Sequence, residues 1–197
     1  MNRAYKYRVY PTAEQEQLLT DTFGSCRFVY NHYLALQSEN YQQGKAYRNK
    51  TACNNDCNRI LKQEQPWLKQ VDKFALTNAI YALDSAYQRF FRRQGGYPRF
   101  KSRHHSRMSY TTNYTNGNIA VLAGEIKLPK LGKVGAVVHR RAPEDWRLKQ
   151  ATVSRESDGS YYVSVLYEYE AAIIPQAVNT EQVIGLDYKS DGLYMDS

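Results

Sequence analysis

The residues whose type and position suggest chemistry lie near the carboxyl end of the sequence. The apolar stretch Val183-Ile184-Gly185-Leu186 predicts a short buried strand that ends at Asp187, and Ser190-Asp191-Gly192 predicts a turn directly after it. A carboxylate at the tip of a rigid strand is well placed to hold a divalent metal ion. The alternative is that Asp187 only begins a turn after an ordinary strand. Asp187 is therefore a candidate metal ligand that needs further carboxylates around it.

The charge of the chain indicates what kind of partner it has. The 197 residues include 27 Lys and Arg against 19 Asp and Glu, which gives a net charge of +8 and a pI near 9.3. Such an excess favours a nucleic acid as the partner, with an acidic membrane surface as the alternative. The sequence has no run of about 18 apolar residues and no apolar signal-peptide core, so we expect a cytoplasmic protein with no membrane partner.

The three cysteines do not follow the spacing of a zinc site. Cys53 and Cys57 are one helical turn apart, whereas a zinc knuckle needs C-x-x-C and a second pair of ligands. Cys26 stands alone. We therefore interpret all three as reduced structural thiols rather than as metal ligands.

The amino-terminal half predicts one strand followed by four helices. Residues 4–10 alternate between Tyr or Val and charged residues, and Pro11 ends this strand. A capping box of Thr12 and Gln15 begins the first helix. The expected helix bounds are Thr12 to about Thr22, Gly24-Ser25 to Gly44, Thr51 to beyond Leu61, and Asp72 to just before Gly95. Short connections between four helices predict a helical bundle inserted after the first strand.

The fourth helix carries a stripe of apolar and aromatic residues that we expect to lie in the core. Its members are Leu76, Ile80, Leu83, Tyr87, Phe90 and Phe91.

A basic segment follows that helix. Seven cations lie between residues 89 and 107, no Asp or Glu lies among them, and Tyr97, Phe100, His104 and His105 are interleaved. The cations are Arg89, Arg92, Arg93, Arg99, Lys101, Arg103 and Arg107. A run of charge is often just a solvated surface, but the lack of compensating acid and the interleaved aromatic rings favour contact with nucleic-acid phosphates. Binding by this segment should depend strongly on salt.

From Ser106 onward the hydrophobic period changes to two, which predicts strands. The expected strands are Ser109–Tyr114, Asn118–Leu122, Glu125–Leu128, Val134–His139, Gln150–Arg155 and Tyr161–Tyr169, the last two joined by a turn at Ser157-Asp158-Gly159-Ser160. Short strands at this spacing predict a small antiparallel OB-like barrel. We expect the first strand of the chain to join this barrel, so the fold class is α+β. Residues 175–181 are expected to form a linker.

Seven segments, in the same order along the chain, resemble the TnpB (OrfB-type) family of transposon-encoded proteins, which are relatives of the type V CRISPR effectors. The segments are Tyr7-Arg8-Val9-Tyr10-Pro11-Thr12-x-x-Gln15, Phe23-Gly24-Ser25-Cys26-Arg27-Phe28-Val29-Tyr30-Asn31, Trp67-Leu68-x-x-Val71-Asp72-Lys73-Phe74-Ala75-Leu76, Ala86-Tyr87-x-x-Phe90-Phe91-Arg92, Gly96-Tyr97-Pro98-Arg99-Phe100-Lys101, Ile126-Lys127-Leu128-Pro129-Lys130-Leu131-Gly132 and Ile184-Gly185-Leu186-Asp187.

The resemblance implies a domain organisation and a set of partners. It implies a wedge barrel (residues 1–10 and 106–180) interrupted by a helical recognition insertion (11–105), followed by the start of an RNase H-like RuvC nuclease (181–197). In this family a transposon-derived guide RNA pairs with target DNA, and the protein contacts backbones and a short duplex motif beside the target. By resemblance, Lys73, Thr77 and Thr115 match positions that contact this motif, although Lys73 would also fit a solvated first-turn residue.

The resemblance breaks down at the nuclease itself. RuvC cleavage uses two divalent metal ions, Mg²⁺ in this family, and these need several carboxylates. Asp187 is the one member of that set in the sequence, and the C-x-x-C pair of the family's zinc ribbon is absent from it. Residues 181–197 supply too few strands for an RNase H-like sheet, so we expect a truncated nuclease domain that binds Mg²⁺ poorly and does not cut.

Three functions fit these residues. The first is the nucleic-acid-binding amino-terminal half of a transposase-associated, RNA-guided DNA endonuclease. The second is a DNA- or RNA-binding module without catalysis, and the third is the remnant of a decayed transposon gene. A scaffold or membrane-surface protein has only the net charge in its favour.

Overall fold

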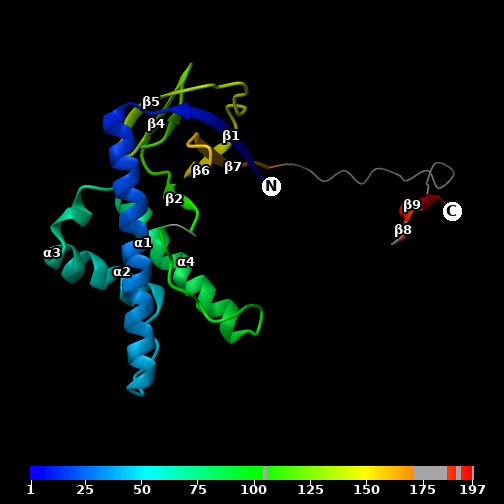
Figure 1. Ribbon diagram of the computed structural model, residues 1–197. Helices are drawn as coiled ribbons and strands as arrows, with labels where there is room; N and C mark the ends of the chain where they lie inside the picture. Colours follow the sequence, from blue (N-terminus) through cyan, green and yellow to red (C-terminus); the bar gives the residue numbers. More distant parts are fainter. Residues whose placement is uncertain (104–105, 171–185, 190–191, 197) are drawn as a thin grey trace.

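A computed structural model describes residues 1–103, 106–170, 186–189 and 192–196 (Figure 1). The first strand, β1 (Asn2–Tyr10), lies inside a seven-stranded antiparallel sheet with the order β2-β6-β7-β1-β5-β4-β3. It pairs along its length with β7, from Asn2 opposite Glu168 to Val9 opposite Tyr161, and its end pairs with β5. The prediction that the first strand joins strands from the second half of the chain is confirmed.

The other strands of the sheet follow the predicted order with adjusted ends. They are β2 (Met108–Asn113), β3 (Ala120–Val121), β4 (Glu125–Leu128), β5 (Gly132–Ala136), β6 (Arg147–Arg155) and β7 (Tyr161–Glu168). The hairpin of β6 and β7 is confirmed, with Arg155 opposite Tyr161 beside the predicted turn. In that turn the backbone N–H of Ser160 donates to Asp158 Oδ1 at 2.9 Å, and Gly159 takes a φ of +85°. The pairing leaves β2 and β3 at the two edges of the sheet.

The first helix is longer than predicted. α1 runs without interruption over Ala13–Gln42, so the predicted break at Gly24-Ser25 is wrong. The buried residues Leu19, Phe23, Cys26 and Tyr30 keep one helical phase across Gly24, and their burial outweighs the roughly 0.5–1 kcal/mol that a glycine costs in a helix. The predicted capping box is present, since Thr12 Oγ1 accepts from the N–H of Gln15 and Gln15 Oε1 accepts from the N–H of Thr12.

The remaining helices connect α1 to the basic segment. They are α2 (Lys50–Asp56), the π-helical η1 (Cys57–Leu61), α3 (Lys62–Glu64), the 3-10 helix η2 (Pro66–Lys69) and α4 (Lys73–Phe91). The cap of α2 is Asn49 rather than the predicted Thr51, because Asn49 Oδ1 accepts from the N–H of Ala52 at 2.9 Å. The predicted cap of α4 is confirmed, with Asp72 Oδ1 accepting from the N–H of Phe74.

The helices pack beside the β2 edge of the sheet, and α1 extends well beyond the sheet (Figure 1). Asn78 of α4 donates through Nδ2 to the carbonyl oxygen of Thr111 in β2 at 2.7 Å. The ring of Phe23 on α1 lies 5.8 Å from that of Tyr110 on β2, measured between centroids. Helices and sheet therefore share one core.

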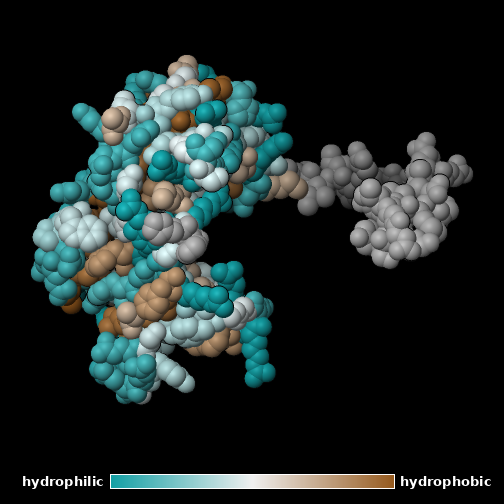
Figure 2. Space-filling model, in the orientation of Figure 1, coloured by the Kyte–Doolittle hydropathy of each residue, from teal (hydrophilic) through white to brown (hydrophobic). Residues whose placement is uncertain are grey.

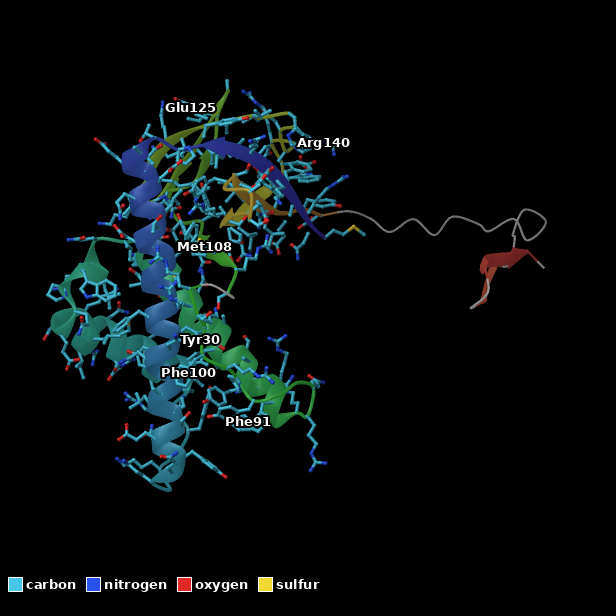
Figure 3. The ribbon with its side chains drawn as sticks, in the orientation of Figure 1. Tyr30, Phe91, Phe100, Met108, Glu125 and Arg140 are labelled. Carbon is cyan, nitrogen blue, oxygen red and sulfur yellow. The ribbon has the colours of Figure 1, made fainter. Side chains whose placement is uncertain are left out.

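The predicted aromatic stripe of α4 enters this core only in part. Leu76, Ile80, Leu83 and Tyr87 are buried, but Phe90 is 36% exposed and Phe91 is 56% exposed, so the prediction is wrong for the last two. They lie in the last turn of α4, at the end far from the sheet (Figure 3). Figure 2 shows hydrophobic residues on the surface of the part of the molecule that the helices form.

The three cysteines are buried free thiols, as expected for structural residues. Burial raises the pKa of Cys26 to about 12 and that of Cys53 to about 11, so both thiols are un-ionised at neutral pH.

The end of the chain forms a second, two-stranded sheet. β8 (Leu186–Lys189) and β9 (Gly192–Asp196) pair in antiparallel fashion, with Leu186 opposite Asp196 and Asp187 opposite Met195. The predicted strand start at residues 183–185 and the predicted linker at 175–181 lie outside the described residues.

Candidate nucleic-acid interface

A positively charged groove lies where α1, η2 and the β2–β6 edge meet. Two neighbouring cavities of about 510 and 620 Å³ share Arg103, Met108 and Arg155 in their walls. Arg27 lines the first cavity and Arg107 the second. We refer to the surface made by Arg27, Arg103, Arg107 and Arg155 as the arginine groove.

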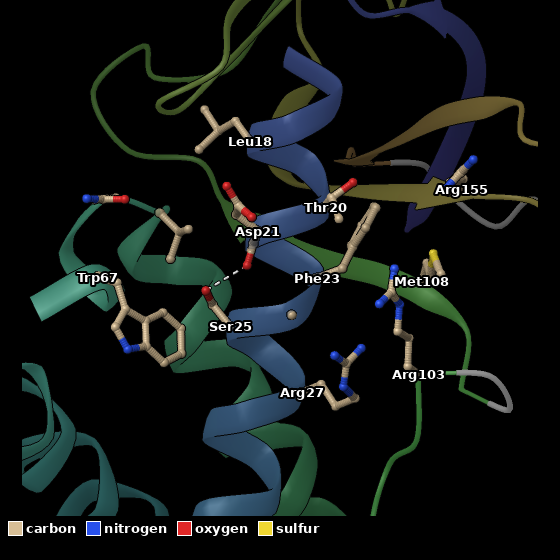
Figure 4. A pocket seen from close by; sticks show the side chains of 13 residues that line it. Leu18, Thr20, Asp21, Phe23, Ser25, Arg27, Trp67, Arg103, Met108 and Arg155 are labelled. Atoms are coloured by element: carbon tan, nitrogen blue, oxygen red, sulfur yellow. Dashed lines mark hydrogen bonds between the residues drawn. The ribbon is translucent and has the colours of Figure 1, made fainter. Parts of the chain in front are cut away.

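Different elements supply the four arginines. Arg27 projects from α1 one turn after Gly24, whose missing side chain leaves the helix surface open there (Figure 4). Arg103 comes from the segment after α4, and Arg155 ends β6 opposite Met108 of β2. The guanidinium carbon of Arg155 lies 5.6 Å from the centroid of the Tyr161 ring, a contact that orients the cation. The groove therefore forms only in the folded chain.

The walls of the groove combine positive charge with flat or flexible apolar side chains. Figure 4 shows Trp67 of η2 on one side of α1, with Phe23 and Met108 near the arginines on the other. Asp21 is the one acid in the wall of the first cavity, and its Oδ1 accepts a hydrogen bond from Gln17 Nε2 at 3.0 Å. Several fixed cations and few acids are what a phosphate backbone requires.

All seven cations of the predicted basic segment are exposed. These are Arg89, Arg92, Arg93, Arg99, Lys101, Arg103 and Arg107. The structure brings Arg103 and Arg107 into the arginine groove, whereas Arg89, Arg92 and Arg93 lie at the far end of α4. His104 and His105, which interrupt the segment, lie outside the described residues.

One acid that is distant in sequence compensates part of this charge. Glu156, from the β6–β7 hairpin, accepts from Lys6 Nζ at 3.0 Å and lies 3.4 Å from a guanidinium nitrogen of Arg107. The hydrogen bond from Lys6 and the two positive charges lower the pKa of Glu156 below its ordinary value. The sequence segment alone gives no sign of this pairing.

Lys101 has a structural role in addition to its charge. Its backbone N–H and carbonyl both bond to the side-chain amide of Asn31 on α1, at 2.8 Å each. Its ammonium nitrogen lies 4.1 Å from the centroid of the Tyr30 ring. Although much of the side chain is exposed, desolvation of the ammonium lowers the pKa of Lys101. These contacts fasten the basic segment onto α1.

The residues suggested for duplex recognition lie on two packed elements. Lys73 is exposed in the first turn of α4, and Thr77 Oγ1 lies 3.0 Å from Asn54 Oδ1. Thr115 is exposed just beyond β2, and its N–H donates to Asn118 Oδ1 at 2.7 Å. Asn78, next to Thr77, bonds to β2, which ties the two elements together. Contact of Lys73, Thr77 and Thr115 with DNA stays a prediction.

No group of three His, Cys, Asp or Glu residues that could hold a metal ion occurs among the described residues. Asp187 lies in β8, and its side chain is not among those described. We therefore assign no step of a reaction to a metal. Within the described part of the chain, no helix has the length and apolar character needed to cross a membrane.

Two of the four groove residues, Arg27 and Arg155, are not among the site residues predicted from the sequence. Arg27 is an isolated cation inside an otherwise apolar helix segment, and Arg155 is a strand end next to a turn. The sequence offers only a weak signal for them, a glycine three residues before Arg27 and another four residues after Arg155.

The chain is similar to a known domain family and to several known proteins. A helix-turn-helix domain family, HTH_OrfB_IS605, matches residues 1–46. The chain is 32% identical over 191 residues to a putative RNA-guided DNA endonuclease from Streptomyces pristinaespiralis, covering 95% of this chain and 46% of that protein. It is 30% identical over 201 residues to the putative RNA-guided DNA endonuclease InsQ from Escherichia coli K12, covering 94% of this chain and 44% of InsQ.

A shorter relative and a solved structure extend this picture. Virulence protein VsdF from Salmonella dublin is 32% identical over 114 residues, which are 53% of this chain and 96% of VsdF. A CRISPR-Cas12f ternary complex gives a TM-score of 0.53 at 12% identity and covers 89% of this chain and 45% of that chain, a likeness of fold. The chain spans about half the length of the two curated relatives named as endonucleases.

Proposed function

The chain belongs to the TnpB (OrfB-type) family of transposon-encoded proteins, and from this premise we propose that its described residues bind a transposon-derived guide RNA together with the DNA duplex beside the target. The observation that carries this proposal is the arginine groove, which gathers Arg27, Arg103, Arg107 and Arg155 from separate elements. In such systems base pairing supplies sequence specificity, and the protein supplies charge along the backbone.

We further assign roles to the parts of the fold. The seven-stranded sheet serves as an OB-like wedge barrel built from residues 1–10 and 106–180, and residues 11–105 form the helical recognition insertion. The packing of α4 against β2 through Asn78 supports a joint surface for Lys73, Thr77 and Thr115 at the duplex. We assign residues 181–197 to the start of the RuvC domain. β8, which carries Asp187, is its proposed first strand.

The proposed role of these 197 residues is binding rather than cutting. RNA-guided DNA cleavage in the whole protein would use Mg²⁺ held by several carboxylates, among which Asp187 would be one. We propose that the protein acts in the cytoplasm.

Salt dependence of binding tests the proposal. The affinity of the purified chain for transposon-end RNA and for a short duplex is measured by fluorescence anisotropy between roughly 50 and 200 mM salt. Each of Arg27→Ala, Arg103→Ala and Arg155→Ala should weaken binding and flatten the slope of log affinity against log salt by roughly 0.7 for single-stranded RNA and 0.9 for duplex DNA.

Arg59→Ala serves as the matched control, because Arg59 is an exposed arginine on η1 outside the groove. It should leave the slope unchanged. The proposal fails if the wild-type chain binds with no salt dependence, or if the groove variants behave like Arg59→Ala.

A further inference from the structure

A separate cavity, of about 420 Å³, lies at the end of the helical part, away from the arginine groove. Six aromatic side chains line it, and we call it the aromatic cavity: Tyr41, Tyr47, Tyr87, Phe90, Phe91 and Tyr97. Figure 3 shows Phe91 near the end of α4 that points away from the sheet. The function proposed above makes no use of this cavity.

Two helices form its walls with the same spacing. α1 contributes Gln37, Asn40 and Tyr41, and α4 contributes Tyr87, Phe90 and Phe91. In each helix these residues follow the i, i+3, i+4 pattern, which places them on one face. Two facing triads at helix ends leave an open slot between them.

The rings are held in place but remain partly uncovered. The Tyr87 and Phe91 rings are nearly parallel at 5.9 Å between centroids, and Tyr47 meets Phe91 edge-on at 5.6 Å. Even so, Tyr41 is 85% exposed, Phe91 56% and Tyr97 48%. Exposed aromatic surface gathered around a hollow indicates a binding site rather than an incomplete core.

Hydrogen bonds between hydroxyls fix the orientation of the rings. The Tyr97 hydroxyl lies 3.0 Å from that of Tyr87 and 2.9 Å from Ser38 Oγ. The Tyr47 hydroxyl donates to Asp84 Oδ1 at 2.9 Å. A flat ligand would therefore meet a platform that is already organised, which reduces the entropy lost on binding.

Asn40 supplies a polar side chain to the wall of the cavity. The residue is 8% exposed. A side-chain amide offers both a hydrogen-bond donor and an acceptor. The edge of a nucleobase presents the complementary groups.

The charge around the cavity selects the kind of ligand. Lys45 lines it, and Arg89, Arg92 and Arg93 flank the two phenylalanines in sequence. Arg93 adopts a φ of 58°, in the left-handed region where a helix usually ends with glycine. Asp84, the acid bonded to Tyr47, also accepts from the N–H of Lys50, so two donors already share its Oδ1. Aromatic rings bordered by cations suit a base with its flanking phosphates.

We propose that the aromatic cavity binds one unpaired nucleobase of a single-stranded segment of RNA. The base stacks on Phe91, its edge bonds to the Asn40 amide, and the adjoining phosphates contact Arg92 and Arg93. This inference rests on the proposed function, since it identifies where an unpaired part of the RNA is held.

The test compares Phe91→Leu with Tyr81→Leu in the full chain, using short oligouridine RNA. Tyr81 is also exposed on α4 but lies outside the cavity. Loss of one stacked base should weaken binding by roughly fivefold to hundredfold for Phe91→Leu, with the salt slope unchanged. Arg92→Ala should instead flatten that slope by about 0.7, and Tyr81→Leu should do neither.

Asn40→Leu and photocrosslinking provide independent readouts. Asn40→Leu should weaken oligouridine binding while an abasic RNA of equal length binds as before. RNA containing 4-thiouridine should crosslink within the peptide from Tyr87 to Tyr97. Thermal unfolding of each variant checks that a loss of binding does not come from a loss of folding.

The outcomes separate this inference from the proposed function. If the chain binds RNA through the arginine groove but Phe91→Leu binds like wild type, the cavity proposal alone is wrong. If the wild-type chain binds no RNA, both fall. If only single-stranded DNA is sensitive to Phe91→Leu, the assignment to RNA is overturned.

Discussion

Glu156 shows how one side chain can set the charge available to a nucleic acid. It pairs with Lys6 at 3.0 Å and with Arg107 at 3.4 Å, and so neutralises part of the surface that borders the arginine groove. Both pairs are solvent-exposed, so they contribute little to the stability of the fold. Under the proposed function, their main consequence is for nucleic-acid binding.

Glu156→Gln should therefore strengthen binding to duplex DNA and steepen its salt dependence by roughly 0.9 for each cation that gains a phosphate contact. The measurement is anisotropy against salt for wild type and variant. Lys149 pairs with Glu168 in a similar exposed bridge outside the groove, so Glu168→Gln is the control. Equal salt slopes for wild type, Glu156→Gln and Glu168→Gln would contradict the idea.

The ion pairs of Glu156 also predict how the stability of the protein depends on pH. Because the pKa of Glu156 is lowered in the folded chain, its contribution to stability is present above its ordinary value of 4.5 and is lost as the pH falls through the lowered value. Acid titration followed by circular dichroism should show this small loss in wild type and not in Glu156→Gln.

At the level of elements, α1 shows that hydrophobic phase can override a local helix breaker. The helix passes through Gly24, and a Cβ added there would meet no atom within 4 Å. Gly24→Ala should thus stabilise the protein by about 0.5–1 kcal/mol. Urea unfolding measures the change in the free energy of unfolding.

Gly117→Ala is the matched control for that prediction. Gly117 also has open space around its Cα, but its φ is +72°, which alanine adopts only with strain. It should destabilise the protein where Gly24→Ala stabilises it. If both substitutions change the free energy of unfolding in the same direction, the continuous path of α1 through Gly24 is not what governs this site.

Sequence reasoning was most successful where the cause is local. Thr12 with Gln15, and Asp72, cap their helices through bonds within three residues, and the β6–β7 turn depends on its own Asp and Gly. It failed where distant parts meet. The arginine groove, the Glu156 pairs and the exposure of Phe91 depend on which elements pack together, and no short segment encodes that.

At the scale of the whole molecule, β1 joins two halves of the sheet that would otherwise not touch. It pairs with β7 on one side and β5 on the other, so its removal leaves β2-β6-β7 and β5-β4-β3 as separate groups. The chain then enters α1, whose Gln15 Nε2 donates to the carbonyl oxygens of Leu131, just before β5, and Lys133, within β5. The first residues thus hold together segments more than a hundred positions away in sequence.

Deleting residues 1–10 should therefore abolish cooperative unfolding of the sheet. The three-stranded remnant on either side would lose β1 as its neighbour, together with the buried side chains of Tyr5, Tyr7 and Val9. Deleting residues 186–197 is the control, since β8 and β9 pair with one another in their own two-stranded sheet. Differential scanning calorimetry should show the transition of the intact chain in the control and none in the amino-terminal deletion. An unchanged transition without residues 1–10 would mean that the two groups of strands are held together by the helices, and that β1 is not the element on which the fold depends.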